Sequence, residues 1–294
     1  MTQRPTAPQR VAPMAFPEAY TLPGRPDQSA PPAVQDTYRE TQWVLGEDLR
    51  LFARAQNLQL AVVRDSYPSR YRSHRLAAAA MLWSRAYLHL SGAVELAVRG
   101  QYAACPALVR AACELTAAEI QLHDAELEAY LAWLEEALRP NESLRGTELG
   151  LGRYLAGETL ASHPRLGPVY RAASELARPH FGVSVLTVAP ESNLQRVAVA
   201  FADTAFHMGW AQMVLGWCLT LADIQLEFAT TAAGTFHVTD EVRAARAALA
   251  REIETLLARR DRCSVEEVMV DGERRFVVHN FRRQPRGAPK RFIL

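Results

Sequence analysis

Apolar residues recur every three to four positions along most of the chain, which is the spacing of one face of an α-helix. Prolines and glycines interrupt this pattern: Pro68 and Pro140 follow two of the periodic segments, and Gly100 follows a third. The last segment begins with Thr239 and Asp240, which favour helix N-termini. The predicted helices cover residues 34–66, 71–98, 106–138, 147–156, 168–177, 193–230 and 241–260.

The two ends of the chain depart from the helical pattern. Residues 1–33 hold eight of the 17 prolines, so we expect an irregular or disordered arm there. Near the C-terminus, VEEVMV and ERRFVVHNF flank Asp271-Gly272, a two-residue turn signal that predicts a β-hairpin. The predicted fold is therefore all-α: an antiparallel helical bundle with long central helices over residues 34–262. The hairpin and a basic tail follow in residues 263–294.

One apolar stretch has nearly the length of a membrane span. Residues 204–222 carry no charge other than a protonated His207, and a bilayer span takes about 20 residues. Asp203 and Asp223 bound the stretch and Gln212 lies inside it, so we interpret it as the buried central helix of the bundle. The N-terminus also lacks the uninterrupted apolar segment of a secretory leader. We therefore expect no membrane among the partners.

Net charge and cysteine usage restrict the classes of protein to which this chain can belong. The formal net charge is +1, which argues against a wholly basic surface that coats nucleic acid. The four cysteines show no CxxC spacing, and three of them (Cys105, Cys113 and Cys218) lie in apolar helical segments. We expect these thiols to be reduced and to act as small hydrophobic side chains, which favours a cytoplasmic protein.

The helix LVRAACELTAAEIQLHD, residues 108–124, contains the least expected polar groups. Arg110 and Glu114 are four residues apart and hence stacked on one helix face, where they can pair. Their neighbours are mostly apolar, so the sequence predicts a buried ion pair. Because such a pair adds little stability over apolar residues, two interpretations stay open. The pair either locks neighbouring helices in register, or it anchors a small anionic ligand through the guanidinium.

Two segments carry a resemblance to a known group of proteins. HRLAAAAMLWSRAYLHLSGAVELAVRGQYAACPALVRAACELTAAEIQLH and YRAASELARPHFG resemble uncharacterised all-helical bacterial proteins near the HEPN-like bundles of abortive-infection and toxin systems. The resemblance implies a helical fold and a role in defence or stress. It also implies that Arg110 and Glu114 lie together with Ser174 and His180.

Catalytic HEPN-like ribonucleases carry an arginine followed by a histidine after four to six residues on a helix. Only Arg274 and His279 have this spacing here, and they fall on the predicted hairpin, where strand alternation places them on opposite faces. We therefore expect no catalytic residues from the resemblance. His180 itself follows Arg178-Pro179 at a helix end, where it either caps the helix or acts as a general acid.

Metal and nucleophile chemistry have little support. Three pairs have the four-residue spacing of a helical metal site: Glu119/His123, Asp203/His207 and Asp223/Glu227. Bundles that hold a di-iron centre carry Glu-x-x-His, which this chain lacks, so we predict neither a metal nor a cofactor. The GxSxG nucleophile turn is also missing.

The C-terminal segment is basic. Between Arg274 and Leu294 there is no acidic residue, and phenylalanines are interleaved with the cations, a combination that can bind phosphates and stack on bases. The candidate nucleic-acid-binding residues are Arg274, Arg275, Arg282, Arg283, Arg286, Lys290 and Arg291.

The sequence thus favours a non-catalytic, cytoplasmic helical-bundle protein, defence- or stress-associated by resemblance. Its Arg110/Glu114/Ser174/His180 cluster is expected to be structural or to bind a small anionic ligand. The Leu/Ala face of residues 241–258 suits self-association, so we expect a homodimer. The alternative is a protein that binds nucleic acid, or cleaves RNA, through the C-terminal hairpin and tail.

Overall fold

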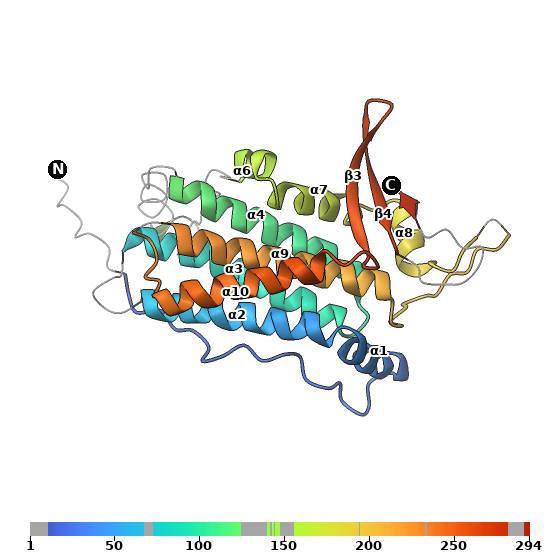
Figure 1. The fold of residues 1–294 in the computed structure, drawn as a ribbon, viewed down its shortest axis with the longest axis horizontal. Coiled ribbons are helices and arrows are strands. Elements are labelled where there is room, and N and C mark those ends of the chain that lie inside the picture. Colours follow the sequence, from blue (N-terminus) through green and yellow to red (C-terminus); the bar gives the residue numbers. More distant parts are fainter. Residues whose placement is uncertain are drawn as a thin grey trace.

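The chain is mostly helical, with a small antiparallel sheet near its C-terminus (Figure 1). The computed structural model describes residues 11–67, 73–124, 140–141, 143, 145–147, 156–193, 195–232, 234–281 and 291–294. The α-helices are α1 (Pro32–Val44), α2 (Gly46–Ser66), α3 (His74–Ala97), α4 (Cys105–Asp124), α6 (Gly157–Ser162), α7 (Leu166–Leu176), α8 (Phe181–Val188), α9 (Met208–Thr231) and α10 (Asp240–Leu257); a 3-10 turn, η1, spans Tyr102–Ala104. The strands are β1 (Pro140–Asn141), β2 (Gly146–Thr147), β3 (Ser264–Val270), β4 (Glu273–His279) and β5 (Phe292–Ile293).

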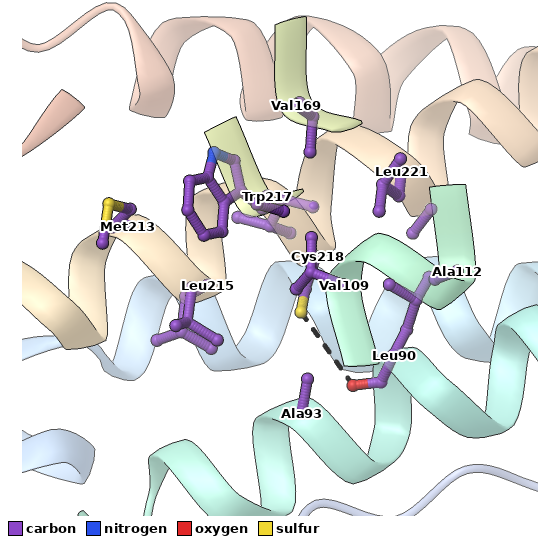
Figure 2. Packing of buried hydrophobic residues seen from close by; sticks show 14 of the residues in the cluster. Leu90, Ala93, Val109, Ala112, Val169, Met213, Leu215, Trp217, Cys218 and Leu221 are labelled. Atoms are coloured by element: carbon purple, nitrogen blue, oxygen red, sulfur yellow. Dashed lines mark hydrogen bonds between the residues drawn. The ribbon is translucent and has the colours of Figure 1, made fainter. Parts of the chain in front are cut away.

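Helix α9 forms the centre of the bundle, as the apolar stretch predicts. It packs against α2, α3, α4 and α10, and 18 of its 24 residues are buried. Figure 2 shows this core, where the Sγ atom of Cys218 lies 3.9 Å from the carbonyl oxygen of Leu90 on α3. No helix in the described part of the chain is long and apolar enough to cross a membrane.

Several helix boundaries differ from the prediction. The predicted helix 34–66 is two helices, because Leu45 leaves helical geometry at ψ 23° and turns its side chain into the core. Helix α3 begins after Ser73, whose hydroxyl caps it, and ends near Gly100 as expected. At Gly100 φ is +75°, and a Cβ would meet the carbonyl oxygen of Thr204 at 2.1 Å, so only glycine is accommodated.

The predicted helix 193–230 is wrong at its beginning. Helix α9 starts fifteen residues later, at Met208, where Nδ1 of His207 accepts a hydrogen bond from the Trp210 amide at 3.3 Å. The preceding segment, residues 195–207, has no helix, whereas the predicted loop before it contains α8. The alternating β-branched residues of this segment disfavour a helix, and periodicity alone did not separate the two cases.

Two other predicted helices fall partly outside the description. The predicted helix 106–138 begins one residue earlier as α4, and its part beyond Asp124 lies outside the described residues. Of the predicted helix 147–156, only the two end residues are described, and Thr147 belongs to β2. The predicted helix 168–177 is α7, which starts two residues earlier so that Pro168 lies in its first turn.

The described part of the proline-rich arm, from residue 11 onward, is irregular as predicted, and it lies against the bundle. We call residues 11–31 the N-terminal strap; it follows α2 along the bundle towards α1 (Figure 1). The Tyr20 amide donates to Oδ1 of Asn57 at 2.9 Å, and the Asn57 side chain donates back to the Tyr20 carbonyl at 3.1 Å. The Tyr20 ring packs edge-on against Phe52. Disorder is therefore the wrong prediction for the strap, because its apolar side chains find a surface to bury them.

The self-association face predicted on residues 241–258 is also corrected. Val242, Leu249, Ile253 and Leu256 of α10 are buried within the same chain, where α10 packs against α2 and α9. An amphipathic helix buries its apolar stripe wherever a partner is at hand, and here the bundle itself is that partner.

The C-terminal hairpin is confirmed. Strands β3 and β4 pair from Ser264↔His279 to Val270↔Glu273, and Asp271 and Gly272 between them have φ values of 53° and 79°. Positive φ at both turn residues is the geometry that this dipeptide favours. A short third strand, β5, pairs with β4 and was not predicted. The hairpin projects from the bundle (Figure 1).

Candidate functional site

The Arg110–Glu114 pair is formed, but it lies at the surface. Nε of Arg110 donates to Oε1 of Glu114 at 3.2 Å, and the Arg110 side chain is 46% exposed. The prediction of a buried pair is therefore wrong. The buried face of α4 is made by Val109, Ala112 and Cys113, and each residue along a helix turns by about 100°, so apolar neighbours in sequence cover a different face.

Helix α7 supplies the nearest further partner of this pair. Partial burial lowers the pKa of Arg110, but Glu114 and the Tyr170 hydroxyl raise it more, so it lies above the ordinary arginine value. The Arg110 guanidinium is thus already neutralised by a carboxylate. An anionic ligand would have to compete with Glu114, and this removes the main reason to predict an anion site here.

Ser174 and His180, the other two members of the predicted cluster, have different surroundings. Nε2 of His180 lies 3.2 Å from Oε1 of Glu175, and its Nδ1 accepts the Val183 amide at 3.3 Å. His180 thereby caps the N-terminus of α8, whereas the sequence argument placed it at the end of the preceding helix. The Ser174 hydroxyl is buried on α7 with no hydrogen-bond partner. Arg110 is paired with Glu114, whereas Nε2 of His180 lies near Glu175 without forming a hydrogen bond, and a ligand-binding role for the four residues stays a prediction.

The described basic residues of the hairpin are paired as well. Arg274 forms an ion pair with Glu267, and Arg275 lies 2.5 Å from Glu273. His279 lies 2.8 Å from Glu266. The sequence argument counted only residues after 273, whereas the antiparallel strand β3 brings its own acids alongside the arginines.

The rest of the basic segment is described only in part. Arg291 is exposed, while Arg282, Arg283, Arg286 and Lys290 lie outside the described residues. Nucleic-acid binding therefore stays a prediction. In the described hairpin, the charges of Arg274 and Arg275 are balanced by acidic side chains.

The three pairs with four-residue spacing do not come together as a set of metal ligands. Asp223 is buried and accepts a hydrogen bond from Arg165 at 2.6 Å, and Glu227 accepts one from the same arginine at 3.0 Å. Arg246 reaches both carboxylates at 3.4 Å. Two arginines thus take the place that a cation would occupy. Within the described ranges, no three His, Cys, Asp or Glu side chains gather closely enough to hold a metal ion.

In the other two pairs, Glu119/His123 and Asp203/His207, the histidine is bonded to a group other than the acid. Nδ1 of His123 lies 3.0 Å from the Thr235 hydroxyl, while the carboxylate of Glu119 is fully buried with no hydrogen-bond partner. His207 caps α9. Neither histidine therefore presents a free Nδ1 towards the acid four residues before it.

All four cysteines are free and buried, as predicted for Cys105, Cys113 and Cys218. Burial raises the pKa of Cys105 and of Cys263 to about 12. Burial also raises the pKa of Cys113 and of Cys218 well above the ordinary thiol value. Because the thiolate is the reactive form, these cysteines are packing residues and not nucleophiles.

A cavity that the sequence did not predict lies between α2, α3 and the N-terminal strap. Its volume is about 120 Å³. The lining residues are Met14, Ala15, Phe16 and Pro17 of the strap, Gln59, Leu60 and Val63 of α2, and Ala80, Trp83, Ser84, Tyr87 and Leu88 of α3. The only signal in the sequence was the run of apolar side chains between the prolines of the arm, which a disordered segment has no reason to carry.

Hydrogen bonds hold the α2–α3 side of the cavity in place. Nε1 of Trp83 donates to Oε1 of Gln59 at 2.5 Å, and Nε2 of Gln59 donates to Gln56 at 2.9 Å. Gln56 in turn donates to the Ser91 hydroxyl at 2.9 Å. The Gln59 amide is thus engaged by neighbouring side chains, and the indole ring is fixed in orientation.

The strap closes the outer side. Nη2 of Arg64 donates to the Glu18 carbonyl at 2.7 Å, and its guanidinium lies 5.9 Å from the centre of the Phe16 ring. Together with the Tyr20–Asn57 hydrogen bonds, these contacts fix the strap to α2 next to the strap residues that line the cavity. The strap covers the cavity without belonging to the helical framework.

Comparison with protein-family models, with curated proteins and with solved structures gives no significant match to this chain. The resemblance to HEPN-like bundles is therefore not tested by these comparisons and stays a prediction.

Proposed function

We propose that the protein binds a small, uncharged apolar molecule in the cavity between α2, α3 and the N-terminal strap. The observation that carries this proposal is the cavity itself, with its predominantly apolar lining. Concave, mostly apolar pockets with few polar groups are the usual form of small-molecule sites. None of the described residues that line the cavity is a carboxylate, an imidazole or a thiol, which supports binding and not catalysis.

The polar groups of the lining favour a neutral ligand. Burial raises the pKa of Tyr87 to about 12, so its phenol is uncharged at neutral pH. The Gln59 amide is already bonded to Trp83 and Gln56. Since no lining side chain is charged, an anionic group would lose hydration without gaining a counter-ion. We therefore expect an apolar ligand in this cavity, in contrast to the anionic ligand that the sequence suggested at Arg110.

The volume sets the size of the ligand. An apolar cavity of roughly 150 Å³ in another protein takes up benzene. A cavity of about 120 Å³ is therefore suited to a single ring or a short branched chain. At about 0.8 kcal/mol per buried carbon, roughly six carbons contribute about 5 kcal/mol. This corresponds to a Kd on the order of 0.3 mM.

The test uses toluene and benzoate, which share a ring and differ in charge. We expect ligand-observed NMR to show saturable binding of toluene and much weaker binding of benzoate. At ten times its Kd, toluene should stabilise the protein by about 1.4 kcal/mol through linkage. For a chain of 294 residues this corresponds to a rise in Tm of roughly 2 to 3 °C.

Two variants make the test specific. Ala80→Leu places a larger side chain on the cavity wall and should abolish toluene binding, whereas Met81→Leu changes the exposed neighbouring residue and should leave it intact. Equal toluene binding by both variants would show that the ligand lies elsewhere. Preferential binding of benzoate would instead favour an anionic ligand.

A further inference from the structure

The N-terminal strap consists of two parts that are held differently. In the part next to α1, Pro23 is buried and its carbonyl accepts a hydrogen bond from the Tyr38 hydroxyl at 3.3 Å. The Ala30 amide donates to the Asp27 carbonyl at 2.9 Å, which closes a turn just before α1. Residues 23–31 therefore form a fixed anchor beside α1.

The part that covers the cavity, residues 11–22, has fewer bonds, and we call it the distal strap. The Tyr20 backbone exchanges two hydrogen bonds with the side chain of Asn57, and the Glu18 carbonyl accepts one from Arg64. Both partners lie on α2. The residues before Glu18 make no hydrogen bond to another described residue. The portion that lines the cavity is thus held by side-chain contacts alone.

The contacts of the distal strap are also weak for their number. Arg64 is exposed, and Phe16, the ring that its guanidinium approaches, is 36% exposed. Water competes for such groups, so an exposed hydrogen bond or cation–π contact adds little to stability. Segments with few buried contacts open locally at a much lower free energy than the whole fold. The distal strap has this character, whereas α2 and α3 do not.

The wall formed by the helices cannot open in the same way. Leu60, Ala80 and Trp83 are buried on α2 and α3, and moving either helix would disrupt the core of the bundle. Leu88 of α3 is 63% exposed, so the cavity reaches the surface where the strap passes α3. Lifting the distal strap would widen this edge into an entrance and leave the helices undisturbed.

We propose that the distal strap is a lid that opens about Pro23 and controls the entry and exit of the ligand. This inference rests on the proposed function, because a lid needs a ligand to admit. Residues 14–17 of the lid line the cavity, so a bound ligand touches them only when the lid is closed. Ligand binding therefore favours the closed state, and opening must precede release.

Amide hydrogen exchange followed by NMR measures the opening in the wild type. The Tyr20 amide reports on the lid, and the Ala30 amide reports on the anchor. Toluene at ten times its Kd stabilises the closed state by a factor of about 11. We therefore expect Tyr20 exchange to slow about tenfold, and Ala30 exchange to change by less than about twofold.

A variant of the lid contacts tests the control of entry. Arg64→Met removes the bond to Glu18 and the contact with Phe16, and residue 64 does not line the cavity. The loss of these two contacts should speed Tyr20 exchange about tenfold without ligand. Arg50→Met is the matched control, since Arg50 is an exposed arginine of α2 that donates to its own helix at Gly46.

The rates of toluene binding give the decisive readout. In Arg64→Met, NMR exchange spectroscopy should show association and dissociation both about tenfold faster than in wild type, with a nearly unchanged Kd. The two rates rise together because both pass through the open lid. Arg50→Met should keep the wild-type rates.

The outcomes separate the lid from the proposed function. If toluene binds and Arg64→Met leaves both rates at the values of Arg50→Met, the ligand enters without strap motion, and the lid is overturned while the proposed function stands. Equal slowing of Tyr20 and Ala30 exchange by toluene would also overturn the lid, since the strap would then open only with the whole fold. A wild type that binds no toluene would overturn the proposed function, and the lid with it.

Discussion

The pH dependence of stability should be governed in part by Glu119. Its side chain is fully buried on α4, and neither carboxylate oxygen has a hydrogen-bond partner. Burial of this carboxyl group raises its pKa well above the ordinary value.

The direction of the pH effect on stability follows from the protonation of Glu119 in the folded and the unfolded chain. Above the ordinary pKa the unfolded chain has lost the Glu119 proton, while the folded protein retains it. Each pH unit in this range lowers the free energy of unfolding by about 1.4 kcal/mol, until the pH passes the pKa of the folded state. The contribution is fully present at low pH and is lost as the pH rises. Glu119→Gln keeps the shape of the side chain and removes the titration.

The assay is urea unfolding of wild type and Glu119→Gln between pH 4 and pH 8. We expect the stability of the wild type relative to the variant to fall steadily above about pH 5. Glu252→Gln is a control whose difference from wild type should stay nearly constant in this range, because the bond to Arg54 lowers the pKa of the exposed Glu252 below the ordinary value of 4.5. If the difference in unfolding free energy between wild type and Glu119→Gln stays constant with pH, Glu119 is not a buried, neutral carboxylic acid in the folded protein.

Two further predictions contrast a buried and an exposed ion pair. Arg262 and Asp48 are both buried, and Arg262 also donates to the Gln212 carbonyl at 3.0 Å. Arg262→Met leaves the Asp48 charge uncompensated and should cost about 3–5 kcal/mol in urea unfolding, while adding Asp48→Leu should restore most of it; additive losses would contradict this. Arg110→Ala removes an exposed pair and should change stability by less than about 1 kcal/mol, and a larger loss by the same measurement would show that Arg110 has a further structural role.

Features that depend on neighbouring residues were predictable from the sequence. The Asp271-Gly272 hairpin, the Thr239 cap of α10 and the stop at Gly100 are all confirmed, because turns and helix ends depend on local backbone geometry. The central position of α9 followed from its unbroken apolar run. Where a local signal was equivocal, as in residues 195–207, the prediction failed.

The candidate sites were much less predictable. The sequence established that Arg110 and Glu114 share a helix face, but their exposure depends on where α7 and the bundle leave that face open. Acids on β3 neutralise Arg274 and Arg275 only because the strands are antiparallel. The cavity needs the strap to meet α2 and α3.

The sequence by itself thus determined the helical class, the hairpin and the identity of the core helix, since periodicity and turn chemistry act over a few residues. Only the tertiary structure decided which polar groups are buried, which charges are neutralised and where a cavity forms. The physical reason is that burial and electrostatic pairing depend on segments far apart in the chain, such as those of Asp48 and Arg262, which are 214 positions apart. Spacing along one helix does not contain that information.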